Sequence, residues 1–143
     1  MNASIKNQIA NRLLAVCKTL PGLRRVVRKR EPFLLEDVKP ALHVVTGAEK
    51  VLYEDERGYN CELAVLFQAI FDENRLPFDA SDAFEAQLQS VIEADAQLGG
   101  LCSKISYRGG IPFIVEHENP VCVVTLMYRV EYRRLRGDAT QNY

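Results

Sequence analysis

The sequence lacks the features of membrane-spanning, secreted and strongly basic proteins. No run approaches the roughly 20 apolar residues that a bilayer span needs. Lys6 and Arg12 interrupt the apolar residues of the N-terminal segment, which therefore does not have the apolar core of a signal peptide. The net charge of −1 lacks the basic excess of a dedicated nucleic-acid binder. We therefore expect a protein that is made and kept in the cytoplasm and contacts no membrane.

Residues suited to catalysis or metal binding are also scarce. His43 and His117 are the two histidines, and we expect both to be structural or solvated. The triplet 116–118 is a poor metal site, because successive strand residues point to opposite faces. The sequence has no P-loop and no G-x-G-x-x-G motif. We expect no enzymatic activity, metal or cofactor, although a Cys–His pair stays open because such pairs form in space.

Four cysteines are present, and none forms a C-x-x-C motif. Cys61 and Cys122 fall among apolar residues of strand-like runs, where a free cysteine behaves as a small hydrophobe. We expect four reduced thiols, at Cys17, Cys61, Cys102 and Cys122.

Two helices are predicted by apolar residues at spacings of three and four. The apolar stripe of the first helix is followed by Pro21 and Gly22, which end the helix. The second helix is predicted over 82–97, where Asp82 and Glu85 resemble a capping box. Gly99 or Gly100 is expected to supply its left-handed C-terminal cap. The first stripe consists of Ile5, Ile9, Leu13, Val16 and Leu20.

Strands are predicted before and after the second helix. Short strands over 41–46 and 51–53 are separated by a turn at Gly47, and a long strand over 59–71 alternates with period two. After the helix we expect strands over 101–107 and 112–118, joined by a tight turn at 108–110.

The final strand, predicted over 121–134, should be central to the sheet. Its inward set is the longest in the chain, and residues 137–143 after it form a polar tail that we expect to be disordered. The inward residues are Cys122, Val124, Leu126, Tyr128, Val130 and Tyr132.

This order of elements predicts an α+β fold. A chain of 143 residues most simply forms one domain, which buries roughly 68% of its unfolded surface. Short connections favour a mainly antiparallel mixed sheet with two helices packed on one face. We assign residues 1–136 to this domain and 137–143 to the tail.

Charged residues are segregated along the chain. One basic cluster covers 24–30, another covers 129–136, and acidic residues concentrate between them. The first cluster fits a solvated edge strand that discourages pairing, or a surface for an acidic patch on another copy or another protein. Nucleic-acid phosphates are less favoured, because exposed aromatic residues are not interleaved with the basic ones. The candidate interface residues are Arg24, Arg25, Arg28, Lys29, Arg30, Glu54, Asp55, Glu56, Arg129, Arg133 and Arg134.

An ordered set of segments carries a resemblance to a known family. The set comprises the helix over 4–20, the entry Pro40-Ala-Leu-His-Val44, the strand over 59–71, the run 92–101 (IEADAQLGGL) and the closing Tyr128-Arg-Val-Glu-Tyr132. With this set the chain resembles the tail terminator and tail-completion proteins of long-tailed bacteriophages, which include lambda-like minor tail proteins.

The resemblance implies a hexameric ring that acts by binding. Such a ring docks on the last ring of the tail tube protein, stops its polymerisation and presents a surface to the head–tail connector protein. It implies assembly in the cytoplasm of the bacterial host and a final place in the virion tail, with DNA only passing through the lumen. Reversing the charges at Arg28 and Lys29 is expected to weaken the ring and leave the fold intact.

Three other interpretations stay open. Neck or head-completion proteins of the same phage module share the motifs. A small α+β enzyme or ligand-binding domain would be favoured by a deep pocket that gathers a histidine and a cysteine. A sheet-based RNA-binding module would show salt-dependent binding to RNA.

Overall fold

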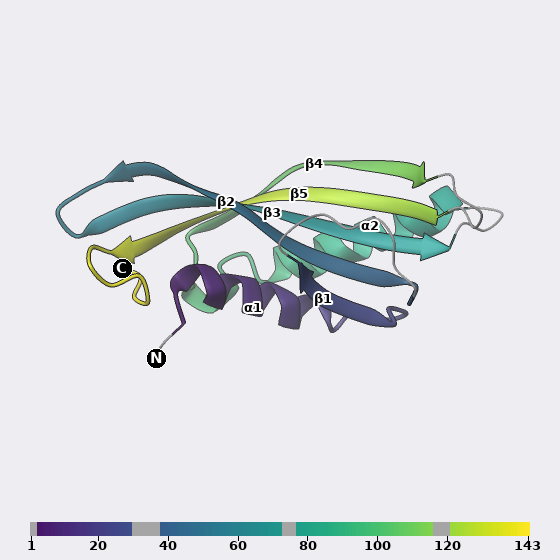
Figure 1. Ribbon diagram of the computed structural model, residues 1–143, viewed down its shortest axis with the longest axis horizontal. Helices are drawn as coiled ribbons and strands as arrows, with labels where there is room; N and C mark the ends of the chain where they lie inside the picture. Colours follow the sequence, from purple (N-terminus) through teal and green to yellow (C-terminus); the bar gives the residue numbers. More distant parts are fainter. Residues whose placement is uncertain (1–2, 30–37, 73–76, 116–120) are drawn as a thin grey trace.

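The computed structural model describes residues 3–29, 38–72, 77–115 and 121–143. Its elements, in chain order, are α1 (Ile5–Cys17), β1 (Arg25–Lys29), β2 (Ala41–Glu54), β3 (Gly58–Asp72), α2 (Pro77–Ala94), the 3-10 turn η1 (Leu98–Gly100), β4 (Lys104–Val115) and β5 (Val121–Leu135) (Figure 1).

The strands form a mixed sheet in the order β1-β2-β3-β5-β4. Strand β1 runs parallel to β2, and the other three pairings are antiparallel. Both helices lie on the same side of this sheet (Figure 1). The structure therefore confirms a single α+β domain with two helices on one face of a mainly antiparallel sheet.

One core joins the helices to the covered face of the sheet. The predicted helical stripe is buried at Ile5, Ile9, Leu13 and Leu20, whereas Val16 is half-buried, and α1 ends at Cys17, before Leu20. The final strand was predicted to be central, but β3 is the middle strand, and β5 is an interior strand between β3 and β4. The predicted inward set of β5 is confirmed, with each residue no more than 2% exposed: Cys122, Val124, Leu126, Tyr128, Val130 and Tyr132.

The predicted start of the second helix is wrong. Helix α2 begins at Pro77 and ends at Ala94, so Asp82 lies inside it and forms no capping box. Proline suits the first turn of a helix, because its φ is already helical and its missing N–H would be unpaired there anyway. Gly99 and Gly100 do have positive φ, of 67° and 93°, but they belong to η1 rather than to the end of α2.

Two predicted turns are irregularities within continuous strands. Residues 108–110 lie inside β4, where the register against β5 shifts between Tyr107 and Gly109. Gly47 lies inside β2, at a similar shift between Thr46 and Glu49. A β-bulge inserts a residue on one strand without breaking the ladder. Two strands therefore follow α2 where three were predicted.

The C-terminal tail folds back onto the domain, contrary to the expected disorder. The amide of Ile5 donates to the carbonyl of Ala139 at 2.8 Å, and the amide of Leu135 donates to Gln141 at 2.9 Å. The side chain of Asn142 donates to the carbonyl of Gly100, also at 2.8 Å. Backbone carbonyls of the tail therefore bond the start of α1 and β5, and the polar side chain of Asn142 bonds η1.

The hairpin of β2 and β3 extends past the helices at the left of Figure 1. We call residues 47–62 the arm. Its turn joins Glu54 to Gly58, and Asp55 closes it by donating its amide to the carbonyl of Gly58 at 2.9 Å. The arm carries one of the surfaces that follow.

Candidate interaction surfaces

The turn of the arm brings together charges that lie far apart in the sequence. The guanidinium of Arg136 is 3.2 Å from the carboxylate of Glu54 and donates to the carbonyl of Asp55 at 3.0 Å. The ion pair is about half exposed, so it contributes ~0–1 kcal/mol to stability. The acidic middle and the basic C-terminal end of the sequence therefore meet in one molecule.

Asp55 is held inside the turn. Its Oδ1 accepts hydrogen bonds from the amides of Gly58 at 3.0 Å and Arg57 at 2.8 Å, and from the hydroxyl of Tyr143 at 3.1 Å. These donors, the Gly58 amide first, hold the pKa of the Asp55 carboxyl below its usual range. Asp55 therefore stays charged and shapes the turn.

Aromatic rings contact two of the predicted interface arginines, Arg133 and Arg134, and also Arg57. The guanidinium of Arg134 lies 4.5 Å from the centre of the Tyr59 ring. Those of Arg57 and Arg133 lie 4.7 and 5.7 Å from the centre of the Tyr143 ring. Such cation–π contacts favour a fixed side-chain position. This end of β5 is therefore organised by contacts within the molecule.

Carboxylates on neighbouring strands pair with Arg129 and Arg134 of β5. Arg129 on β5 is 3.6 Å from Glu62 on β3, and Arg134 is 3.9 Å from Glu49 on β2. The buried Tyr132 also donates its hydroxyl to Glu49. Each β5 arginine of the predicted interface thus has an acidic or aromatic neighbour in the same chain.

Most of the first basic cluster lies on β1 (Arg25–Lys29), at an edge of the described sheet, and Arg24 precedes this strand. Arg24 and Arg25 are exposed, while Arg28 and Lys29 are half-buried; Arg30 lies outside the described residues. Arg28 donates to Asn7 of α1 at 3.2 Å and to Thr46 of β2 at 3.1 Å.

Those two contacts change the expected effect of charge reversal. Replacing Arg28 by an acidic residue would remove both hydrogen bonds, so it should lower stability by about 1–3 kcal/mol besides changing the charge of this surface. Arg24 and Arg25 are the better probes of this surface, because both are exposed.

An exposed apolar run on the arm was not predicted as a surface. Val51, Leu52 and Tyr53 are 49%, 36% and 50% exposed, and a second register shift falls between Val51 and Tyr53. The sequence did contain a signal. Successive strand residues point to opposite faces, so three consecutive apolar residues between Lys50 and Glu54 cannot all face one core.

A groove of about 400 Å³ lies between the end of α1 and α2. Leu20 and Pro21 line one side, and Ala86 and Val91 of α2 line the other, together with Thr19, Gln87 and Ser90. We call it the α1–α2 groove. Its mainly apolar lining suits apolar side chains rather than a charged ligand.

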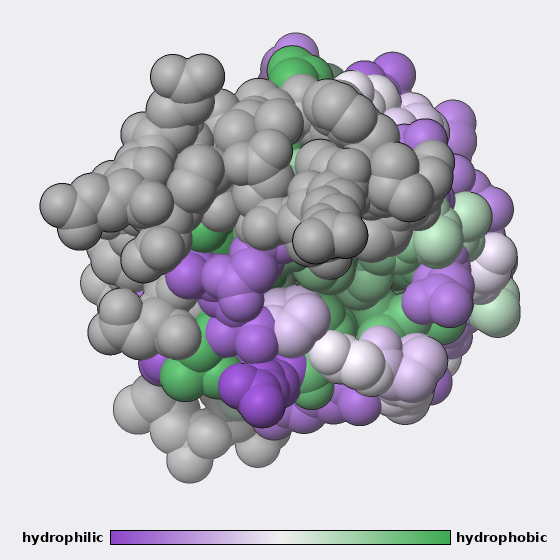
Figure 2. Space-filling view, turned by 90° about the vertical axis from the view of Figure 1, so that its right-hand side faces the viewer, coloured by the Kyte–Doolittle hydropathy of each residue, from purple (hydrophilic) through white to green (hydrophobic). Residues whose placement is uncertain are grey.

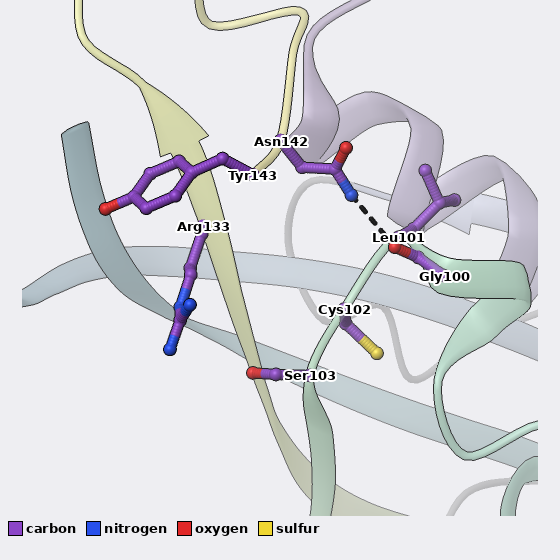
Figure 3. A pocket seen from close by; sticks show the side chains of 7 residues that line it. All are labelled: Gly100, Leu101, Cys102, Ser103, Arg133, Asn142 and Tyr143. Carbon is purple, nitrogen blue, oxygen red and sulfur yellow. Dashed lines mark hydrogen bonds between the residues drawn. The ribbon is translucent and has the colours of Figure 1, made fainter. Parts of the chain in front are cut away.

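A smaller pocket of about 220 Å³ lies between the tail, η1 and β5 (Figure 3). Burial raises the pKa of the Cys102 thiol to about 11, so this thiol is neutral at physiological pH and is not an activated nucleophile. Ser103 donates its hydroxyl to the carbonyl of Glu131 at 3.1 Å. Among the described residues that line this pocket there is no histidine, so no nucleophile–base pair forms here.

His43 is fully buried in β2, opposite Gln68 of β3 and Val27 of β1. Its place in the middle of the ladder fits a structural role. His117 and the rest of the triplet 116–118 lie outside the described residues, so their expected role stays a prediction. All four cysteines are buried and free, as predicted: Cys17, Cys61, Cys102 and Cys122.

The described residues contain neither a cluster of metal ligands nor a helix suited to cross a membrane. Within the described ranges, no three histidine, cysteine, aspartate or glutamate side chains gather as metal ligands would. No helix among the described residues has the length and apolar character for a bilayer crossing. The end of the molecule away from the arm shows hydrophilic areas beside hydrophobic ones (Figure 2).

Comparison with known proteins gives likenesses in structure. No family model matches the chain, and no curated protein matches it. A chain in the solved structure titled "Virion of native gene transfer agent (GTA) particle" is similar, with 14% identity, a TM-score of 0.43 and 92% of each chain covered. A likeness at this identity and TM-score carries no functional argument.

Proposed function

We propose that this protein is a virion structural protein that closes the head-proximal end of a phage tail tube as a hexameric ring. The resemblance of the ordered segments to tail terminators supports this function. The structural observation that carries the proposal is the arm, which extends past the helices and exposes Val51, Leu52 and Tyr53. An exposed apolar run on a projecting element is suited to protein–protein contact.

The proposed mechanism uses binding energy and no chemical step. A ring bound to the last tube ring would cover the surface to which the next tube subunits add, and its other face would meet the head–tail connector protein. The neutral thiol of Cys102 and the absence of a histidine from the described lining of its pocket favour this binding role over catalysis.

Tube assembly in vitro tests the proposal. The tail tube protein encoded in the same genome would be polymerised with and without this protein, and tube lengths would be measured by electron microscopy. We expect growth to stop at the end that carries a ring. Unchanged tube length at a stoichiometric excess of folded protein would contradict the proposal.

The same preparation separates the neck alternative. A neck or head-completion protein would leave the tube uncapped and would bind the purified head connector instead. Heat-unfolded protein is the control for non-specific effects on polymerisation.

A further inference from the structure

The far end of the arm is not held by the hydrophobic core. We call residues 51–57 the tip of the arm, and every one of them is exposed. Helices α1 and α2 do not reach this part of the hairpin (Figure 1). Segments that bury little apolar surface open locally at a low cost in free energy. Apart from its strand pairing, the tip therefore depends on polar contacts from other segments.

Residues 136–143, which we call the strap, supply such contacts from both of their ends. At one end, the amide of Arg136 donates to the carbonyl of Arg57 at 2.8 Å, and its guanidinium donates to the carbonyl of Asp55 at 3.0 Å. At the other end, the hydroxyl of Tyr143 donates to the carboxylate of Asp55 at 3.1 Å. The Tyr143 ring also lies 4.7 Å from the guanidinium of Arg57. The strap therefore closes over the turn of the arm.

The middle of the strap is bonded to the helical layer of the domain. The amide of Ile5, at the beginning of α1, donates to the carbonyl of Ala139 at 2.8 Å. The side chain of Asn142 donates to the carbonyl of Gly100 in η1, also at 2.8 Å. One continuous segment thus connects α1 and η1 to the tip of the arm. A shift of the strap at η1 should consequently change how firmly the tip is held.

The strap can leave without opening the core. A pocket of about 220 Å³ lies beneath Asn142 and Tyr143, so the strap is not close-packed against η1 and β5 (Figure 3). The hydrogen bonds of these two side chains are exposed. Exposed hydrogen bonds contribute little net stability, because water replaces them when they break. Release of the strap therefore removes little packing from the helices and the sheet.

We propose that the strap fixes the tip of the arm, and that displacement of Tyr143 from the turn releases the tip while the core stays folded. The strap would regulate the apolar run Val51–Tyr53, and its biological role rests on the proposed function of that run. A segment that is already held in its binding conformation loses less freedom when a partner binds. The arm is therefore ready to bind while the strap is in place.

Hydrogen exchange followed by NMR at the amides of Asp55 and Arg57 tests the proposal. These amides donate within the turn, to the carbonyl of Gly58 and to the carboxylate of Asp55. Tyr143→Ala should speed their exchange at least tenfold and leave unchanged the amide of Phe67, which lies in the middle strand β3. Unchanged exchange at the tip, or equal acceleration at Phe67, would overturn the strap.

A matched pair of hydroxyl deletions tests the hydrogen bond of Tyr143 by itself. Tyr143→Phe keeps the ring and removes the hydrogen bond to Asp55. Tyr53→Phe removes a hydroxyl from a ring on the tip that is 50% exposed. Exchange at the tip should rise several-fold in Tyr143→Phe and stay within about twofold of the wild type in Tyr53→Phe. Equal exchange in the two variants would overturn this hydrogen bond as part of the strap.

Asn142→Ala tests whether the strap connects η1 to the tip. The side chain of Asn142 bonds Gly100 of η1 and not the tip. Its loss should still speed exchange at the amides of Asp55 and Arg57 several-fold. Gln141→Ala is the matched control, because Gln141 is exposed and bonds Leu135 through its backbone carbonyl. Exchange at the tip equal to that of the wild type in Asn142→Ala would overturn the connection.

Failure of this inference is distinguishable from failure of the proposed function. If the wild type stops tube growth but Tyr143→Ala leaves exchange at the tip unchanged, the function stands and the strap is wrong. If Tyr143→Ala loosens the tip but the wild type leaves tube growth unchanged, the strap stands and the capping function is wrong. With both correct, Tyr143→Ala should need at least tenfold more protein than the wild type to stop tube growth.

Discussion

Leu126 shows how strongly a single buried residue of β5 should affect stability. Its side chain has no exposed surface, whereas the adjacent Met127 on the other face is 37% exposed. Leu126→Ala should lower the free energy of unfolding by ~2–5 kcal/mol, because it removes buried methyl groups and leaves a cavity. Met127→Ala, the matched control, should cost well under half as much. Urea denaturation measures both, and a loss below ~0.5 kcal/mol for Leu126→Ala, the range of surface substitutions, would contradict this core.

The buried thiol of Cys102 should make the stability of the fold decrease at alkaline pH. The thiol is 6% exposed, and burial raises its pKa from 9.0 to about 11. The contribution of the protonated Cys102 thiol to the free energy of unfolding is fully present below about pH 9. Between pH 9 and 11 the unfolded chain loses this proton first, so stability should fall by ~2–3 kcal/mol.

Cys102→Ala isolates this effect, because alanine does not ionise. Urea unfolding at pH 8, 9 and 10 should show a smaller loss of stability for the variant than for the wild type. Burial also raises the pKa of Cys17, to about 12, so part of the decline should persist in the variant. Parallel losses in the two proteins would contradict the assignment to Cys102.

Among the elements, those with strong periodicity were predictable and their irregularities were not. The apolar stripe of α1 and the alternation in β3 and β5 can be recognised in the local sequence, because each shows which face of its element is buried. Gly109 and Gly110 signal a tight turn and a bulge equally well, and only the unbroken partner strand β5 decides for the bulge. Pro77 and Asp82 are both valid helix starts, and the chain uses the earlier one.

The pairing of β3 with β5 at the base of the turn depends on Gly58. A Cβ added there would lie 2.0 Å from the carbonyl oxygen of Arg134, a backbone atom that cannot move without separating the strands. Gly58→Ala should therefore cost ~1–3 kcal/mol or more through overpacking. Gly47→Ala is the matched control on the arm, because its nearest atom would be the Cβ of Ala64 at 3.4 Å, an ordinary contact.

Chemical denaturation checks this prediction, together with hydrogen exchange of the Arg136 amide, which donates to the carbonyl of Arg57 at 2.8 Å. We expect Gly58→Ala to lose stability and amide protection at the end of β5, and Gly47→Ala to lose little of either. Equal stability of the two variants would show that the strands tolerate a side chain at this position.

In the whole molecule, clusters of charged residues could be located from the sequence, but not which of these residues become neighbours in the fold. Arg136 and Glu54 are separated by most of the domain in sequence, and only the length of the arm brings them together. The exposed run 51–53 became visible as a surface once β2 proved to extend past the helices. Candidate residues can thus be proposed from composition, whereas their neighbours follow from long-range strand register.

The salt dependence of association should distinguish ionic from apolar contacts between the subunits of the proposed ring. Charges near the surface are screened over ~8 Å at physiological ionic strength and over ~3 Å at about 1 M. Raising the salt should therefore weaken association of the wild type several-fold without abolishing it, because the apolar run is not screened. Arg24→Gln combined with Arg25→Gln should associate more weakly at low salt and respond less to added salt. Sedimentation measurements with equal salt dependence for the two proteins would show that Arg24 and Arg25 take no part in the ionic contacts of the ring.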